Sequence, residues 1–176
     1  VWEIRDEETA KLAVESSITG HLLFSTLHTN SAVHTIQRLH NLGVDPLLIS
    51  SSLRLIISQR LVRKLCPHCK EKYVPDEKIK TWLIWKIWRY IKDKDNLELY
   101  KNKDWGCEKC NNTWFKWRTW IYEVLEMNDK IEDLLLKNAS RTQLEIQAIW
   151  DWMVTIKEDA LIKVIMWETT LQEVLS

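Results

Sequence analysis

Hydrophobic and polar positions divide the first third of the chain into alternating strand and helix patterns. Residues 1–4 read as the end of a buried strand, and Asp6 then caps a helix with apolar residues on one face. The short apolar run 21–27, bounded by turn residues, is typical of a central strand in an α/β sheet. A second helix is expected over about 30–42, with Gly43 as the residue that ends it. This alternation predicts an α/β fold.

A third, strongly apolar helix is expected to begin at Asp45 and Pro46, because Asp is a good N-cap and Pro is tolerated at the first helical position. Its apolar residues continue to Ile57, so we expect it to run that far and to lie against the core. Polar and apolar residues then alternate over 60–65, as in a strand.

The rest of the chain predicts a helical insert, a strand or hairpin and a helical end. Residues 76–90 have a helical pattern, whereas 92–103 are charged and are expected to be irregular. Residues 115–127 alternate, as in a strand or hairpin. Helices are then expected after three Ser or Thr residues that have Gln or Glu three positions later, namely Ser140, Thr155 and Thr170, and a fourth helix is expected to start at Asn128.

The composition is that of an ordinary globular domain. The 176 residues are 45% hydrophobic and 28% charged, and 25 basic side chains balance 25 acidic ones. We therefore expect one main domain with a small appended module, and no overall field that attracts nucleic acid or an anionic membrane. No apolar run reaches the length of about 18 residues that a membrane span needs, and there is no signal-peptide pattern, so we expect a cytoplasmic protein. Because the chain starts at Val1, inside an apparent strand, we expect it to be part of a longer protein.

All the cysteines fall into two equally spaced pairs, Cys66 with Cys69 and Cys107 with Cys110. Two thiolates separated by two residues can face one ion from a tight turn, and two such turns complete a tetrahedron around Zn²⁺. A site with four sulfur ligands leaves no position for a reacting water, so its role would be structural. The intervening residues 70–106 are too many for a simple zinc ribbon and must hold an extra element. The alternative is two disulfides, which cytosolic proteins rarely contain.

Several segments together resemble the secretion ATPase superfamily. Residues 3–10 (Glu-Ile-Arg-Asp-x-Glu-Thr-Ala), 19–22 (Thr-Gly-His-Leu) and 25–30 (Ser-Thr-Leu-His-Thr-Asn) are similar to its Walker B and His-box segments. Residues 59–66 (Gln-Arg-Leu-Val-Arg-Lys-Leu-Cys), the second cysteine pair and 118–123 (Arg-Thr-x-Ile-Tyr-Glu) resemble the type II secretion and type IV pilus assembly ATPases, the GspE, PulE and PilB type. The resemblance extends along nearly the whole chain.

The resemblance implies a fold and an organisation. Residues 1–65 would be the C-terminal part of a RecA-like P-loop ATPase core, 66–112 a four-cysteine zinc module with a helical insert, and 113–176 a strand or hairpin followed by C-terminal helices. Such proteins are cytoplasmic homo-hexamers at the inner face of the cell membrane. They use ATP and Mg²⁺ to extend a pilus or pseudopilus, and they reach the membrane through partners, chiefly an inner-membrane platform protein. Pilus retraction ATPases generally lack the cysteine module.

The resemblance also suggests roles for particular residues. A carboxylate at the end of a buried strand can hold Mg²⁺ through water and polarise the attacking water, and Glu3 has that place. His28 would reach the γ-phosphate side and report its presence to the subunit interface. Arg5 and Asp6 would orient the turn, and Thr26 would support the nucleotide site. Alone, Glu3 would be taken for a surface acid and His28 for a core histidine; their joint occurrence in this order favours the functional interpretation.

The phosphate-binding part of such a site is not in this sequence. No Gly-x-x-x-x-Gly-Lys-[Ser/Thr] occurs among the 176 residues. The family's Asp box and arginine fingers would likewise precede Val1. We therefore expect these residues alone to be unable to hydrolyse ATP.

The tryptophan content is unusual, with eleven tryptophans and only three glycines, although glycine normally makes up about 7% of a protein. Members of the family usually carry glycine at six of the tryptophan positions: Trp2, Trp114, Trp117, Trp120, Trp152 and Trp167. One hypothesis explains them all, namely that the source reads the UGA codon as glycine and that the sequence was translated with UGA as tryptophan. The alternatives are a natural aromatic-rich variant and a deliberately altered chain. The same may be asked of the remaining tryptophans, Trp82, Trp85, Trp88, Trp105 and Trp150.

Two other functions deserve comparison. A zinc-ribbon module could bind nucleic acid through basic residues, here Arg60, Arg63, Lys64, Lys70 and Lys72, and the segments 85–90 and 114–118 could stack on bases. The zero net charge argues against specific nucleic-acid binding, and the stacking surfaces vanish if the tryptophans are glycines. The module could instead be a docking surface for the platform protein, which is compatible with an ATPase. The sequence leaves open whether the motor serves secretion, piliation or DNA uptake, and which pilin or substrate it acts on.

Overall fold

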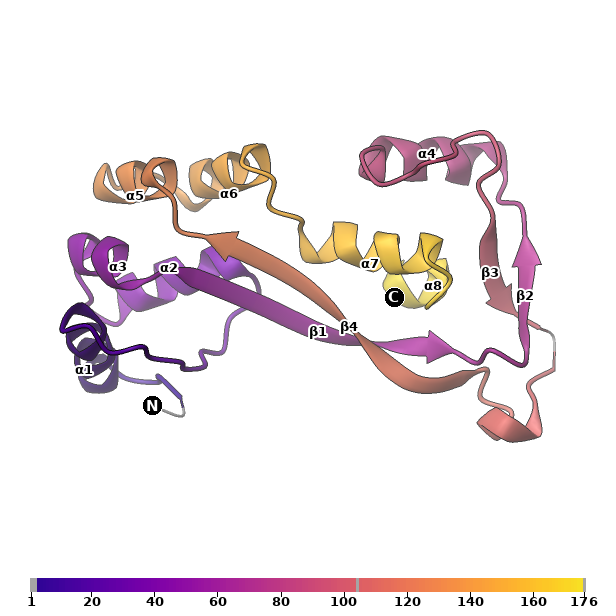
Figure 1. The fold of residues 1–176 in the computed structure, drawn as a ribbon, viewed down its shortest axis with the longest axis horizontal. Helices are drawn as coiled ribbons and strands as arrows, with labels where there is room; N and C mark the ends of the chain where they lie inside the picture. The colour runs from indigo at the N-terminus through magenta and orange to yellow at the C-terminus, as the bar shows by residue number, and fades with distance from the viewer. Residues whose placement is uncertain (1–2, 104, 176) are drawn as a thin grey trace. The chain divides into compact units, whose positions relative to one another are not determined.

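The computed structural model describes residues 3–103 and 105–175, drawn as a ribbon in Figure 1. The chain forms two compact units, and each is assembled from two separate stretches of sequence. The first unit comprises 1–58 and 123–154, and the second comprises 59–122 and 155–176. In the described part of the chain, no helix is both long enough and apolar enough to cross a membrane.

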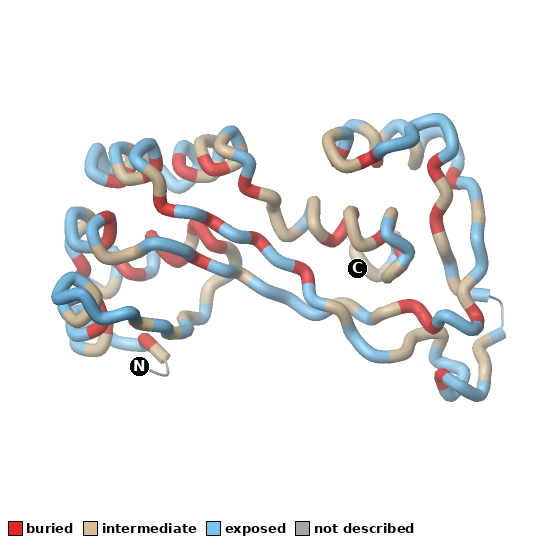
Figure 2. Tube along the Cα trace, viewed as in Figure 1, coloured by how far each residue is buried: buried red, intermediate tan, exposed pale blue. Residues whose placement is uncertain are grey.

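Three helices near the N-terminus confirm the pattern of the first third of the chain. Helix α1 (Glu7–Ile18) begins at Asp6, whose side chain accepts a hydrogen bond from the backbone N–H of Thr9. Helix α2 (Ala32–Asn41) follows, and helix α3 (Pro46–Ser52) has the expected proline in its first turn. The buried apolar residues of these helices, coloured red along the trace in Figure 2, belong to one hydrophobic cluster.

The expected strand at 21–27 is shorter than the sequence predicts. Its only described pairing is a parallel bridge between Glu3 and Thr26. Leu22 and Phe24 are 85% and 79% exposed. An apolar run forms a ladder only where neighbouring strands supply hydrogen-bond partners, and the described residues supply one such pairing here. The extended segment is present, but the full strand is not.

The apolar segment after α3 is also different from the prediction. The helix ends at Ser52, and the chain then enters strand β1 (Leu55–Leu65), so the expectation of a helix through Ile57 was wrong. Ile56 is buried and Ile57 is exposed, as alternating strand positions are. Strand β1 pairs with β4 (Phe115–Glu126), which confirms the strand expected over 115–127. The tertiary pairing decides the conformation of this β-branched stretch.

Two further helices complete the first unit. Helix α5 (Asp129–Leu136) starts at Asn128, which confirms the fourth expected helix, and α6 (Arg141–Trp150) starts with a full capping box at Ser140. Helix α5 packs against α3 and α6, and α6 packs against α2. The least exposed side chains of this core include Val33, Ile36, Ile49 and Ile131.

The second unit contains an antiparallel pair of short strands. Strand β2 (Lys70–Tyr73) pairs with β3 (Leu99–Asn102), so the prediction that 92–103 is irregular was wrong for its last part. The charged composition hides the strand, because only one side of it is covered and Leu99 is its single fully buried residue. Helix α4 (Glu77–Ile87) lies between these strands in the sequence and confirms the helical insert.

The C-terminal helices complete the second unit. Helix α7 (Ile156–Ile165) begins with the expected capping box at Thr155, and α8 (Leu171–Leu175) follows. Helix α7 packs against α4, β3 and α8. The core that they share is built from leucine, isoleucine and valine side chains, including Leu83, Ile87, Leu99, Leu161 and Val164.

Candidate nucleotide and metal sites

The structure brings the two principal candidate residues, Glu3 and His28, together near the N-terminus. We call the region around the Glu3–Thr26 bridge the N-terminal edge. His28 Nε2 lies 3.0 Å from Glu3 Oε1. Arg5 donates a hydrogen bond from Nη2 to the other oxygen of the same carboxylate, at 2.5 Å. The side chain of Glu3 is 22% exposed and that of His28 is 89% exposed. A shielded carboxylate therefore lies beside an accessible imidazole, close to the point where the segments of Glu3 and Thr26 pair.

The surroundings of Glu3 favour its charged form. The hydrogen bond from Arg5 lowers the pKa of the carboxyl group. Desolvation opposes this effect to a smaller extent, and the charge of Arg5 lowers the pKa further. The same contact raises the pKa of Arg5. Glu3 is thus a carboxylate at neutral pH, which is the form that a magnesium ion or its bound water requires.

Among the described residues, two buried polar atoms near the Glu3–Thr26 bridge have no hydrogen-bond partner. These atoms are Glu3 Oε1 and Ser25 Oγ. The imidazole of His28 is close to the first, but the two groups do not have hydrogen-bond geometry. Buried polar atoms are normally paired, so unpaired oxygens call for a missing partner. Oxygen donors of this kind fit hydrated Mg²⁺ and the water around a phosphate.

Asp6 and Thr26 occupy supporting positions. Asp6 Oδ1 accepts the backbone N–H of Thr9 at 2.8 Å, and this bond lowers the pKa of the Asp6 carboxyl group. The carbonyl of Thr26 accepts the N–H of Ile4 at 2.9 Å. Asp6 therefore fixes the start of α1, and the backbone of Thr26 fixes the segment next to Glu3.

The four cysteines converge on one point. Their sulfur atoms all lie within 4.8 Å of one another. The Sγ–Sγ distances are 3.7 Å from Cys66 to Cys107 and 3.6 Å from Cys110 to both Cys69 and Cys107. A tetrahedron with Zn–S bonds of about 2.3 Å has edges of about 3.8 Å, so the cluster could hold zinc. All four cysteines are free, and a disulfide needs an S–S distance of about 2 Å, so the disulfide alternative does not fit.

The backbone around the cysteines forms two tight turns. Cys110 lies in a single turn of 3₁₀ helix, η1 (Glu108–Cys110), whose N-cap is Cys107. A Cβ atom on Gly106 would lie 2.4 Å from the Cα of Asn112, so only glycine fits there. The N–H of Cys66 donates to the carbonyl of Trp114 at 2.9 Å, which joins the two turns.

The thiols have different acidities. Hydrogen bonding to the backbone of Cys107 lowers the pKa of the Cys110 thiol to about 6. Burial raises the pKa of Cys69 and of Cys107. A metal ion binds the thiolate, so binding at this cluster must release protons from Cys69 and Cys107, whose thiol pKa values are raised.

The basic residues considered for nucleic-acid binding are largely engaged within the second unit. Arg63 makes a paired contact with Glu173, Lys64 lies 3.2 Å from Glu168, and Lys72 is paired with Glu98. Lys70 lies over the Tyr100 ring at 4.5 Å and donates to a backbone carbonyl. A phosphate would have to displace these partners, so the nucleic-acid alternative loses support.

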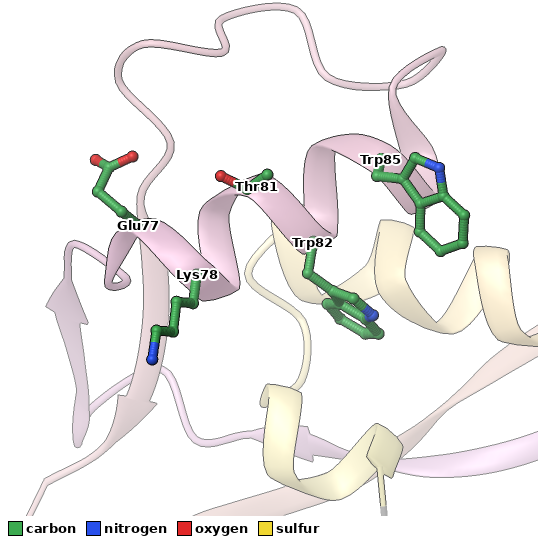
Figure 3. A pocket seen from close by; sticks show the side chains of 5 residues that line it. All are labelled: Glu77, Lys78, Thr81, Trp82 and Trp85. Atoms are coloured by element: carbon green, nitrogen blue, oxygen red, sulfur yellow. The ribbon is translucent and has the colours of Figure 1, made fainter.

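A hollow of about 580 Å³ lies beside α4, seen in Figure 3. Its lining comes from one helix: Glu77, Lys78, Thr81, Trp82 and Trp85. A ligand site usually encloses its ligand between elements and presents convergent polar groups. This hollow is an open surface feature whose walls depend on two of the tryptophans, and it is no candidate for nucleotide binding.

Glu123 lies in the segment 118–123 that carries the family resemblance, but it was not among the candidate site residues. Its carboxylate is buried in β4 and accepts the backbone N–H of Ala32 at 2.6 Å. The available indication was its place in the alternation of β4, since Ile121 and Leu125 are the apolar residues on the same face. A charged residue at an apolar position of a strand points to a specific partner.

Comparison with known proteins adds an independent result. The family model described as "Type II/IV secretion system protein" matches residues 1–176. The type II secretion system ATPase E of Vibrio cholerae is 43% identical over 175 residues, which are 99% of this chain and 33% of that protein. The type IV pilus assembly ATPase PilB of Thermus thermophilus is 41% identical over 176 residues, 100% of this chain and 19% of that protein. The chain thus spans a third or less of these relatives.

Solved structures show the same fold. A crystal structure of the pilus retraction motor PilT with bound ADP matches with a TM-score of 0.63 and 24% identity, over 99% of this chain and 37% of that one. The Legionella pneumophila ATPase DotB matches with a TM-score of 0.62 and 19% identity, over 99% of this chain and 36% of that one. The α/β fold of this chain is therefore that of these ATPases.

Proposed function

The chain belongs to the type II/IV secretion system protein family, and we propose that it is the C-terminal part of an ATPase that drives type IV pilus assembly or type II protein secretion. The observation that carries this proposal is the pairing of a shielded, ionised Glu3 with His28 at 3.0 Å, near Ser25 Oγ, which is buried and has no hydrogen-bond partner among the described residues. Relatives from both systems are similar to a comparable degree, so the proposal covers both.

Each residue of this edge has a proposed task. Glu3 would hold a magnesium-bound water and orient the attacking water, since its carboxylate is ionised and largely shielded. Arg5 keeps that carboxylate charged and fixed in orientation. His28, which is exposed, contacts the γ-phosphate side and carries the nucleotide state to a neighbouring subunit. Bound MgATP supplies the phosphoryl group and the metal charge.

The remaining parts of the proposed nucleotide site come from residues outside these 176, because the sequence contains no phosphate-binding loop. The complete protein would act as a homo-hexamer in the cytoplasm, at the inner face of the cell membrane. It would be held there by an inner-membrane platform protein. The four cysteines would hold a structural Zn²⁺ ion, as the separation of their sulfurs allows.

Substitution Glu3→Gln in the full-length natural protein tests this function. We expect ATP turnover to fall by about 100-fold or more while the Kd for ATP changes by less than about threefold, because the substitution removes a charge used in the transition state. The control is Glu15→Gln, an exposed acid of α1 outside the segment 3–10, which should leave turnover unchanged. Unchanged turnover in Glu3→Gln would refute the proposed role.

A further inference from the structure

Strand β4 carries a carboxylate on the face that it turns to the core. Ile121, Glu123 and Leu125 alternate with exposed residues, and they are 4%, 5% and 2% exposed. Position 123 is thus as buried as its apolar neighbours on the same face. Removing an ionised carboxylate from water is unfavourable unless charge-assisted hydrogen bonds replace the lost hydration.

The partner of Glu123 is the first turn of α2. Its Oε1 accepts the N–H of Ala32, the first residue of that helix, at 2.6 Å, and Ala32 is itself completely buried. The N-terminus of a helix has unpaired N–H groups and a partial positive charge, so a carboxylate there is stabilised. The N-cap Ser31 accepts the N–H of His34 instead, at 3.4 Å. The two side chains therefore satisfy different donors of the same helix end.

This helix end determines where His28 lies. Residues 28–31 run directly into α2. Thr29 Oγ1 lies 3.0 Å from Thr35 Oγ1, which fastens the same segment to the next turn of the helix. Only three residues separate His28 from Ala32, whose N–H Glu123 accepts. A movement of the helix end would therefore displace His28 and change its distance from Glu3.

We propose that Glu123 is a positioning residue for ATP hydrolysis: it fixes the N-terminus of α2 and thereby places His28 against Glu3. The inference rests on the proposed function of His28. Glu123 accepts its hydrogen bond from the backbone of Ala32, so it acts through the helix end. Misplacing a group at a reacting centre by about 1 Å can lower the rate by about 100-fold.

Hydrogen exchange in the full-length natural protein tests the structural step. Glu123→Ala should increase the exchange rate of the Ala32 amide by about tenfold or more, because that N–H loses its acceptor. Glu123→Gln should restore most of the protection, since its amide oxygen can still accept the bond. Leu125→Ala, a buried neighbour on the same face, is the control for a general loss of packing. Equal exchange at Ala32 in Glu123→Ala and Leu125→Ala would overturn the inference.

Kinetics test the functional step. Glu123→Ala should lower kcat by about tenfold or more with little change in KM, and Glu123→Gln should recover most of kcat. Leu125→Ala, compared at an equal folded fraction, should keep kcat. In a His28→Ala background, Glu123→Ala should have no further effect, because the two substitutions remove one interaction. If Glu123→Ala lowers kcat in the His28→Ala background as much as it does in the wild-type protein, the inference is overturned. If His28→Ala alone leaves turnover unchanged, the role of His28 fails, and the exchange result still decides whether Glu123 fixes the helix end.

Discussion

Four tryptophans adopt a backbone conformation that large L-residues rarely take. Trp114, Trp117, Trp152 and Trp167 have φ angles of 63°, 69°, 74° and 66°. This left-handed region favours glycine because it brings the Cβ atom close to the following backbone. All four are positions at which the family resemblance leads us to expect glycine. Of the other two, Trp120 lies within β4 and has no such angle, and Trp2 falls outside the described residues.

The helix ends make the comparison direct. Helices α1, α2 and α5 end with the same two backbone hydrogen bonds, and their left-handed residues are Gly20, Gly43 and Asn138. Helices α6 and α7 end with the same pair of bonds, but the left-handed residues are Trp152 and Trp167. Five helices therefore use one terminal motif, and it requires glycine or asparagine at a position that holds tryptophan in two of them.

Replacing Trp152 with glycine should stabilise the protein. The left-handed conformation costs a residue with a Cβ atom about 1–2 kcal/mol, and the extra freedom of glycine in the unfolded chain offsets up to about 1 kcal/mol. We expect Trp152→Gly to raise the free energy of unfolding by about 1 kcal/mol, as measured by denaturant titration. The control is Trp85→Gly, an exposed position inside α4, which should lower it by about 1 kcal/mol. A loss of stability in both variants would contradict the steric argument.

Mass spectrometry of the protein from its natural source tests the recoding hypothesis. Peptides that contain residues 114, 117, 152 and 167 should have masses that correspond to glycine if UGA is read as glycine there. Tryptophan masses at Trp114 and Trp117 would refute recoding, and the protein would then carry the strain of these angles.

At the scale of elements, two carboxylates attach the C-terminal segment to the strands of the second unit. Glu173 accepts the backbone N–H of Arg63 at 3.0 Å and its guanidinium Nε at 2.9 Å. Glu168 accepts the hydroxyl of Thr119 at 2.9 Å and lies 3.2 Å from Lys64 Nζ. Helix α8 is too short to be stable alone, so these contacts hold it in place.

The attachment of α8 should weaken in acid. The hydrogen bond from Arg63 lowers the pKa of the Glu173 carboxyl group from its ordinary value of 4.5. A carboxyl group with a lowered folded-state pKa stabilises the protein above that ordinary value, and the contribution is lost as the pH falls through the folded-state pKa. We expect proteolysis near α8 to accelerate below about pH 4.5, with a loss of up to about 1 kcal/mol. The Glu173→Gln variant should be cleaved faster than the wild-type protein at neutral pH, and its cleavage rate should increase less as the pH falls. An identical response in both proteins would argue against this role.

Removing metal should loosen the cysteine module. We expect about one Zn²⁺ per chain, lost to a strong chelator, with faster proteolysis between the cysteine pairs afterwards. Cys66→Ser should abolish stoichiometric zinc. His68→Ala is the matched control, because His68 lies between two of the cysteines and is not part of the sulfur cluster. Undiminished zinc in Cys66→Ser, or none in the wild-type protein, would rule out the four-sulfur site.

At the scale of the whole molecule, the proposed nucleotide site is incomplete within this chain. This chain contains Glu3, the candidate for the magnesium-bound water, and His28, the candidate for the γ-phosphate side. Its sequence has no phosphate-binding loop. We expect residues 1–176, produced alone, to show no ATP turnover above background, whereas the full-length protein should hydrolyse ATP. Phosphate release measures both. Turnover by residues 1–176 that Glu3→Gln abolishes would contradict this expectation.

Local patterns predicted most of the helices and the cysteine cluster. Caps such as Asp6 and Ser140 act within one turn, so the sequence alone indicates where those helices begin. The same local reasoning failed at Ile57, which belongs to β1, and at Leu99, which belongs to β3. A strand depends on a partner that is distant in the sequence, and its residues do not identify that partner.

The sequence by itself determined the family resemblance, the four sulfur ligands and the pairing of Glu3 with His28 as candidates, because each depends on residue type and spacing. Only the tertiary structure decided three other features. It brought Glu123 to the first turn of α2, placed Arg63 against Glu173, and gave Trp152 the backbone angle of a glycine. Each of these depends on contacts or backbone angles that form only when the chain folds, and such contacts join residues as far apart as 63 and 173.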